Sequence, residues 1–463
     1  MAAEDALSHA LAIARVYMAT RGDRAVWPTS TLAELRAALD GPLPADPIDP
    51  TTVVDELARA VEPGLVATTG PRYFGFVTGG AVPAAVAADW LTAAWDQNAG
   101  LYVMSPAAAI VEEVAGRWLI DVLGLVPGAS VAFVTGAHMA SFTSLAAARH
   151  GLLRRVGWDV EGDGLQDAPK LRVIVGEEVH ASVIGALRLL GIGSRQLVRV
   201  LADDQGRMRS DALSNAIAAS TAPTIVCAQA GNVNTGAFDP FEEIAAIASA
   251  HGAWLHVDGA FGLWAAAVDS LKHHLRGVER ADSWATDAHK WLNVTYDSGL
   301  AFVAHPAAHQ AATSVNAAYL VRTAEEPREP MDWTPESSRR ARGFAVYAAL
   351  RSLGRSGVAE LVERCCRLAA RFAERLREER TIRILNEVVL NQVLIRIAPP
   401  GVDADIATRD ALRHVQEERV CWVGGTRWHG MEAIRISVSN WSTTKADVDL
   451  SADSIVRAAR LQQ

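Results

Sequence analysis

The sequence predicts an α/β protein with a large, mostly parallel β-sheet domain followed by a smaller α+β domain. Between residues 70 and 310, short apolar runs alternate with amphipathic stretches of helical length, which is the pattern of right-handed βαβ units. After a polar, proline-marked segment at 304–340, a long amphipathic stretch precedes further short apolar runs. A length of 463 residues also exceeds what one hydrophobic core normally organises, so at least two domains are expected.

Residues 1–69 are predicted to form a helical arm. Leu7, Leu11 and Ala14 recur at helical spacing, and a proline-rich connector separates them from a second helix that begins at Thr51 or Thr52. The large domain is expected over 70–310. Its strands are predicted at 131–134, 171–175, 224–228, 254–257, 283–286 and 299–303, and its helices at 107–123, 138–155, 181–190, 210–219 and 240–251.

Residues 311–340 are predicted to form an active-site loop and connector, and residues 341–463 the small C-terminal domain. In the small domain the periodicity favours a long helix, a strand, a second helix and a further strand. These elements are predicted at 341–379, 390–397, 403–418 and 433–438.

Composition excludes several classes of protein. Half of the residues are apolar and 21% are charged, as in a globular protein rather than a disordered one. The 53 acidic residues outnumber the 44 basic ones, which argues against a nucleic-acid binder. The four cysteines form no CxxC pair, so we expect neither a disulfide framework nor a metal site.

The sequence shows no targeting or membrane signal. The first residues lack the basic and apolar regions of a secretory signal. The most apolar stretch, 79–95, contains Pro83 and Asp89 and is too short to span a bilayer. We therefore expect a cytoplasmic protein without membrane contact.

A glycine turn lies where the first predicted strand of the large domain meets its helix. The chain reads Phe-Val-Thr-Gly-Ala-His-Met-Ala-Ser at 133–141, so a helix begins directly after Gly136. The free N–H groups and the positive end of the helix dipole would suit a phosphate group. An ordinary strand-to-helix turn explains the same pattern, and by itself the motif leaves both interpretations open.

Asp258 follows a buried-looking strand and precedes two small residues. A carboxylate at an apolar strand end is costly unless a positive charge or several donors offset it. Asp258 either caps the next helix or holds a proton on a ligand nitrogen.

Lys290 is one of only four lysines among 44 basic residues, and it stands between His289 and Trp291. A lysine in an apolar pocket has a depressed pKa and can act as an amine nucleophile. The alternative is a lysine whose stem passes Trp291 to reach solvent.

Together these motifs are similar to those of the group II pyridoxal-phosphate-dependent amino acid decarboxylases, the family of aromatic amino acid, histidine and glutamate decarboxylases. Lys290 follows Asp258 by 32 residues, with the glycine turn upstream, and the resemblance covers nearly the whole chain. The stretches that carry it are 72–80, 105–113, 179–183, 235–240, 256–260, 289–292 and 435–444.

The resemblance implies an aspartate aminotransferase-like fold of type I, with a seven-stranded large domain and pyridoxal 5'-phosphate as cofactor. It also implies a homodimer whose active sites are shared between subunits. Lys290 would bind the cofactor covalently, Asp258 would keep its pyridine nitrogen protonated and His180 would stack on its ring. The remaining cofactor-binding positions are Gly136, Ala137 and His138 at the phosphate, with Ala260 and His289.

For the substrate, the resemblance points to Thr78, Phe76 and Asn98. Tyr319, in the predicted loop, resembles the catalytic tyrosine that returns a proton to the substrate Cα. Catalysis would therefore depend on Lys290, His180 and Tyr319.

Some positions depart from the family pattern. His138 and Met139 stand where Ser and Glu are more common, Val233 stands where a hydroxyl residue is common, and Asp287 stands where relatives often carry Asn. Gly75 and Asn98 replace larger or more apolar residues of the aromatic decarboxylase pocket, so the substrate need not be a plain aromatic amino acid.

The implied reaction is decarboxylation of an L-amino acid to an amine and carbon dioxide. Two other reactions on the same scaffold stay open: oxygen-dependent decarboxylative deamination to an aldehyde, and a lyase reaction on a modified amino acid. His180 and Tyr319 argue against the aldehyde route. A third alternative is a non-catalytic scaffold protein, against which the Lys290–Asp258 pair argues.

Overall fold

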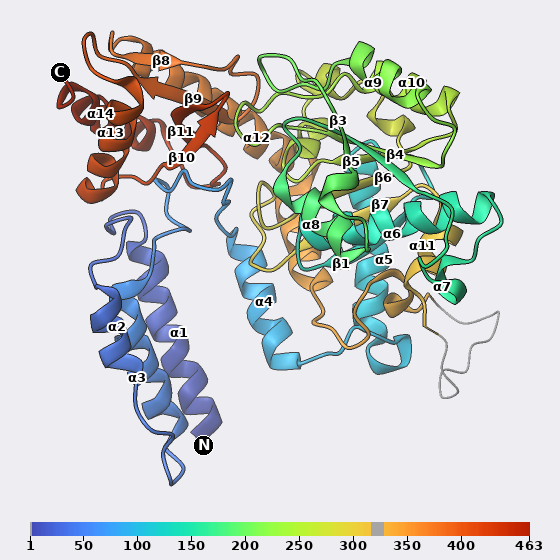
Figure 1. The fold of residues 1–463 in the computed structure, drawn as a ribbon. Helices are drawn as coiled ribbons and strands as arrows, with labels where there is room; N and C mark the ends of the chain where they lie inside the picture. Colours follow the sequence, from blue (N-terminus) through green and yellow to red (C-terminus); the bar gives the residue numbers. More distant parts are fainter. Residues whose placement is uncertain (1, 316–327) are drawn as a thin grey trace.

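The computed structural model describes residues 2–315 and 328–463 and contains one large sheet and one small sheet (Figure 1). The seven strands of the large sheet follow the order β1-β7-β6-β5-β4-β2-β3. All neighbouring strands are parallel except β7, which runs antiparallel to both β1 and β6. The strands are β1 (Ser130–Val134), β2 (Arg172–Gly176), β3 (Val198–Val200), β4 (Thr224–Gln229), β5 (Trp254–Asp258), β6 (Ser283–Asp287) and β7 (Gly299–Val303).

Helices cover both faces of this sheet, which is why its strands are apolar on both sides. In β4, Ile225 and Cys227 contact the layer that contains α6 and α8, whereas Val226 and Ala228 face the main core beneath α5, α9 and α10. These helices are α5 (Pro106–Val122), α6 (Ala137–Arg155), α8 (Ala181–Leu189), α9 (Ser210–Ala218) and α10 (Phe241–Ala250), with the shorter α7 (Val160–Asp163) and α11 (Pro306–Thr313).

The small domain contains a four-stranded antiparallel sheet in the order β10-β11-β9-β8. The long helix α12 (Gly343–Arg377) connects it to the large domain and is interrupted at Gly354, whose φ of 62° is left-handed. Its other elements are β8 (Ile382–Ile384), β9 (Gln392–Ile397), α13 (Ala404–Glu418), β10 (Gly424–Trp428), β11 (Met431–Ser437) and α14 (Lys445–Arg460).

The N-terminal arm stands apart from the large sheet, below the small domain in Figure 1. Helix α1 (Ala2–Thr20) packs along α3 (Pro50–Val61), and α2 (Leu32–Leu39) also contacts α3. Thr31 and Glu34 form a reciprocal capping box at the start of α2, and the Asp49 side chain caps α3. Helix α4 (Pro83–Trp95) follows the arm and packs against α12.

The predicted fold class is confirmed, and most predicted elements lie within two residues of the observed ones. The additional elements are the short strands β3, β8 and β10, with the helices α2, α4, α7, α11 and α14. The three residues of β3 and of β8 carry too little alternation to stand out from neighbouring loops, and the five residues of β10 begin with two glycines, which disfavour a strand. The four predicted domain limits stay predictions. Among the helices of the described residues, none is both long and apolar enough to cross a membrane.

Candidate active site

The candidate site lies where strands of the large sheet end together. Strands β1, β2, β4, β5 and β6 all point the same way, so the residues that follow them meet at one edge of the sheet. This arrangement brings together Gly136, His180, Asp258 and Lys290, which are far apart in the sequence.

Lys290 lies just after β6, and its Nζ is 2.8 Å from Asp287 Oδ2. Its side chain is 20% exposed. Burial by itself lowers the pKa of Lys290, but the neighbouring Asp287 carboxylate and then Asp258 outweigh it, so the pKa is raised. The expected depressed lysine pKa is therefore wrong for the protein without its cofactor, because two carboxylates face the amine.

Asp258 ends β5 and is only 5% exposed. Its Oδ1 accepts a hydrogen bond of 3.2 Å from the Ala260 N–H. Burial raises the pKa of Asp258, and the nearby His180 and Lys290 counteract this only in part. A buried carboxylate of this kind suits a protonated ring nitrogen, since that cation would offset the cost of burial.

His180 is the N-cap of α8, and its Nδ1 accepts from the Ser182 N–H at 3.2 Å. Nδ1 also lies 2.7 Å from the Ser182 hydroxyl oxygen. Burial lowers the pKa of His180, while Asp258 raises it. The ring is therefore oriented by its own helix and placed close to Asp258 and Lys290.

The glycine turn brings the start of α6 close to β6 and β7. A Cβ at Gly136 would lie 3.2 Å from His289 Cε1, and a Cβ at Gly299 would lie 2.4 Å from the Gly136 backbone. The first N–H of the helix, on Ala137, donates to Asp287 Oδ1 at 2.5 Å.

His138 and His289 flank this turn in different ways. The His138 ring packs against Gly185 of α8, so His138 offers the site its backbone rather than its side chain. His289 Nδ1 accepts from the Ser298 N–H at 3.1 Å, and its Nε2 is 3.4 Å from Asp287 Oδ1. Burial lowers the pKa of His289.

The segment 75–80 crosses directly over the lysine turn. A Cβ at Gly79 would lie 1.9 Å from the Lys290 carbonyl oxygen, so only glycine fits there. Phe76 and Val77 have φ values of 52° and 56°, a strained conformation that surrounding contacts must maintain. Thr78 is buried, whereas Phe76 is 63% exposed and lies beside Trp422.

Asn98 makes contacts of another kind. Its Oδ1 accepts from the N–H groups of Gly100 and Arg339, at 3.0 and 3.2 Å, so it holds the segment that precedes α12. Its assignment to the substrate stays a prediction. Tyr319 lies outside the described residues.

Sequence reasoning missed three residues of this region. Asn293, with φ 57°, accepts from the Gly80 N–H at 2.7 Å and from the Trp441 N–H at 2.9 Å, which joins segments from both ends of the chain. Tyr296 stacks on His289 with ring centroids 4.2 Å apart, and burial raises the pKa of its phenol while the nearby Thr78 lowers it. Arg435 of β11 contributes positive charge near His180. An Asn three residues after Lys290 was a usable sequence signal, because Asn tolerates a left-handed φ, but Arg435 lies near His180 only through domain packing.

The residues present fit pyridoxal phosphate. They supply an amine for covalent attachment, a buried carboxylate for the ring nitrogen and a helix N-terminus for the phosphate. Val233 is partly buried and packs against the main core.

The sequence matches the model of the pyridoxal-dependent decarboxylase conserved domain over residues 33–398. Tryptophan decarboxylase 2 of Oryza sativa subsp. japonica is 25% identical over 427 residues, which covers 90% of this chain and 86% of that protein. Phenylacetaldehyde synthase of a Rosa hybrid cultivar is 26% identical over 386 residues, which covers 80% of this chain and 74% of that one. The acidic amino acid decarboxylase of Bos taurus is 29% identical over 348 residues, covering 73% and 65%.

Solved structures share the fold over almost the whole chain. A crystal structure of the Oryza sativa enzyme TDC with PLP and tryptamine superposes with a TM-score of 0.92 at 24% identity, covering 99% of this chain and 98% of that one. Mouse CSAD gives a TM-score of 0.90 at 22% identity, covering 99% and 98%.

Proposed function

Because the chain belongs to the pyridoxal-dependent decarboxylase family, we propose that it converts an L-amino acid to the corresponding amine and carbon dioxide. It is an enzyme of the carboxy-lyase class that uses pyridoxal phosphate. The observation that carries the proposal is the convergence of Lys290, Asp258 and His180 at one edge of the sheet.

Bound pyridoxal phosphate supplies an electron sink, which accepts the electron pair left when the substrate carboxylate departs as carbon dioxide. Lys290 would hold the cofactor covalently through Nζ. Asp258 would keep a proton on the ring nitrogen, because its buried carboxylate gains most from a cation beside it. His180 would stack on the cofactor ring, since its own contacts with Ser182 fix the imidazole.

The departing carboxylate must be replaced by a proton at the substrate Cα. We assign this donation to Tyr319, as the resemblance implies. Thr78 and Phe76 lie on the segment that covers the lysine turn, which suits contact with substrate. We keep Asn98 as a third substrate residue.

The test is to incubate the cofactor-loaded protein with a panel of L-amino acids and to quantify amine, aldehyde, ammonia, carbon dioxide and dissolved oxygen. We expect amine and carbon dioxide in equal amounts without oxygen consumption. Lys290→Ala should fold as the wild type does, lose the absorbance of covalently bound cofactor and reduce turnover to background. Full activity of Lys290→Ala would refute the proposal.

The relatives include aldehyde synthases, so the panel must separate two outcomes. Aldehyde and ammonia formed with oxygen consumption would identify the oxidative reaction instead. With Tyr319→Phe, we expect product to shift from amine toward aldehyde, because protonation at Cα then competes poorly with oxygen. Unchanged products would assign the proton to another donor, with His180 the next candidate.

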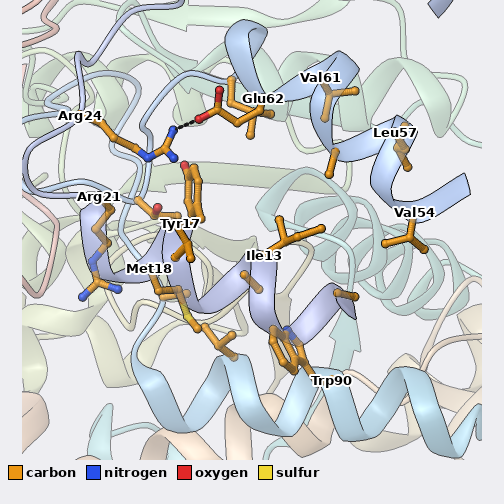
Figure 2. A pocket seen from close by; sticks show the side chains of 18 of the residues that line it. Ile13, Tyr17, Met18, Arg21, Arg24, Val54, Leu57, Val61, Glu62 and Trp90 are labelled. Atoms are coloured by element: carbon orange, nitrogen blue, oxygen red, sulfur yellow. Dashed lines mark hydrogen bonds and ion pairs between the residues drawn. The ribbon is translucent and has the colours of Figure 1, made fainter. Parts of the chain in front are cut away.

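We also propose that the protein is a homodimer, because the N-terminal arm leaves apolar surface uncovered. A groove of about 750 Å³ runs between α1, α3 and α4. Figure 2 shows apolar side chains from these helices facing it, including Ile13, Leu57 and Trp90, with the Arg24–Glu62 ion pair at one end. Leu57 and Trp90 are 55% and 41% exposed.

We assign this groove to a second copy of the chain. In a dimer with a two-fold axis, the apolar arm of each copy would cover the groove of the other. Light scattering coupled to gel filtration should give twice the chain mass for the wild type. Leu57→Glu should shift the equilibrium toward monomer, whereas Glu56→Gln on the same helix should not. A monomeric wild type would exclude the dimer.

A further inference from the structure

The Asp287 carboxylate contacts both groups that the proposed function gives to the cofactor. Its Oδ1 accepts from the Ala137 N–H at 2.5 Å, at the start of the helix assigned to the phosphate. Its Oδ2 lies 2.8 Å from Lys290 Nζ, the amine assigned to covalent attachment. One acidic side chain therefore occupies the anion position at the α6 N-terminus and pairs with the lysine.

The backbone of Asp287 cannot carry this carboxylate away. Its N–H donates to the Ala260 carbonyl at 2.9 Å, and its carbonyl accepts from Trp264 Nε1 at 3.0 Å. It is also paired with Gly299 in the register of β6 and β7. Its side chain is 3% exposed, so it can leave the Ala137 N–H only by rotating within the site.

The basic groups that contact Asp287 do not neutralise a second anion there. Lys290 already balances Asp287, and burial lowers the pKa of His289, which keeps that imidazole neutral. Asp258 adds a further acidic group next to Lys290. A phosphate that reached the α6 N-terminus would meet a carboxylate of like charge in a poorly hydrated setting, where repulsion is strong.

We propose that Asp287 is a positioning residue that competes with the cofactor phosphate for the N-terminus of α6 and holds the Lys290 ammonium group in the cofactor-free enzyme. The cofactor consequently binds more weakly than it would without the Asp287 charge, because the carboxylate repels the phosphate group. This inference rests on the proposed function, in which Gly136, Ala137 and His138 receive the phosphate.

The matched variant is Asp287→Asn, which keeps an oxygen acceptor for the Ala137 N–H and removes the charge. Two probes isolate the phosphate: pyridoxamine 5'-phosphate and pyridoxamine differ only in that group, and neither can bind Lys290 covalently. We titrate each into the full-length cofactor-free enzyme by calorimetry. Asp287→Asn should tighten pyridoxamine 5'-phosphate binding at least about tenfold and change pyridoxamine binding less than about threefold.

Asp297→Asn is the control, because Asp297 is an acidic residue on the same connection that pairs with Arg342 at 2.8 Å instead. It should change neither affinity more than about twofold. Asp287→Ser also keeps a side-chain oxygen without charge, so it should likewise tighten the binding of pyridoxamine 5'-phosphate. Agreement between the two variants shows that the change in affinity does not come from a folding defect in one of them.

Unchanged or weaker binding of pyridoxamine 5'-phosphate by both folded Asp287 variants would overturn the inference. An equal gain for both probes would also overturn it, because the repulsion would then not act on the phosphate. Failure of the proposed function would give a different result. The wild type would then bind neither pyridoxamine 5'-phosphate nor pyridoxal phosphate, and borohydride would fix no cofactor to Lys290.

Discussion

At the scale of single residues, charge is distributed over one lysine and two buried carboxylates. Asp287 pairs directly with Lys290, while Asp258 lies further along the same edge with a raised pKa caused by burial. The two acids therefore have different tasks. In the proposed function, Asp287 pairs with the lysine of the cofactor-free enzyme, and Asp258 would hold the protonated ring nitrogen of the cofactor.

Asp258→Asn tests the second task. The amide keeps the size of the side chain but cannot hold a proton on a ring nitrogen by charge. We expect carbon dioxide release to slow by about a hundredfold or more, with the cofactor still attached to Lys290. Radiometric or manometric assay of carbon dioxide measures the effect. The control is Asp269→Asn, an exposed acid paired with Lys272, which should retain the wild-type rate. A wild-type rate for Asp258→Asn would remove Asp258 from this role.

At the scale of elements, a buried ion pair connects the strand that leads into the site with the helices behind it. Arg339 Nη1 and Nη2 lie 2.7 and 2.5 Å from the two carboxylate oxygens of Glu112 on α5. Arg339 also donates to the Phe133 carbonyl of β1 at 3.3 Å. Both charged side chains are almost fully buried, at 1% and 2% exposure. The pair fixes α5, β1 and the chain before α12 relative to one another.

Arg339→Met should therefore be strongly destabilising, since it leaves the Glu112 carboxylate buried without a partner. We expect a loss of about 3–5 kcal/mol in the free energy of unfolding, measured by urea denaturation. Arg117→Met provides the comparison: Arg117 pairs with Glu113 on the surface of the same helix, and its loss should cost less than about 1 kcal/mol. If the two substitutions lowered the free energy of unfolding equally, the buried pair would contribute no more to stability than the surface pair.

At the scale of the whole molecule, two buried histidines link stability to pH. Burial lowers the pKa of His256 and of His309 to about 3. His309 bridges the Ser130 hydroxyl oxygen at 2.8 Å and the Trp333 carbonyl at 3.0 Å. Both imidazoles are neutral in the folded protein, whereas unfolding exposes them to water and restores a pKa near 6.5.

The unfolded state thus binds more protons below pH 6.5, so stability is lost as the pH falls from about 6.5 toward 3, by up to about 1.4 kcal/mol per pH unit for each histidine. Asp239 acts in the opposite direction, because burial raises its pKa to about 6. His309→Gln should make the loss between pH 6.5 and 5 less steep by roughly one histidine's share. Urea unfolding at several pH values compares the slopes, and an unchanged slope would contradict the assignment to His309.

The sequence by itself determined the local elements and the two most informative site residues. Apolar periodicity is a local property, so the strands and helices around the site could be located along the chain. Asp258 and Lys290 were recognisable because they stand at or just beyond the ends of neighbouring parallel strands, which share one edge, and because their spacing resembles the family motif.

Only the tertiary structure decided which groups meet and what charge they carry. The contact of Asp287 with both Ala137 and Lys290 depends on the pairing of β6 with β7 and on the close approach of Gly136, which no local pattern encodes. The raised pKa of Lys290 also depends on the tertiary structure. Burial lowers this pKa and a facing carboxylate raises it, and packing sets the balance between the two effects. Arg435 belongs here as well, since it approaches His180 only when the two domains come together.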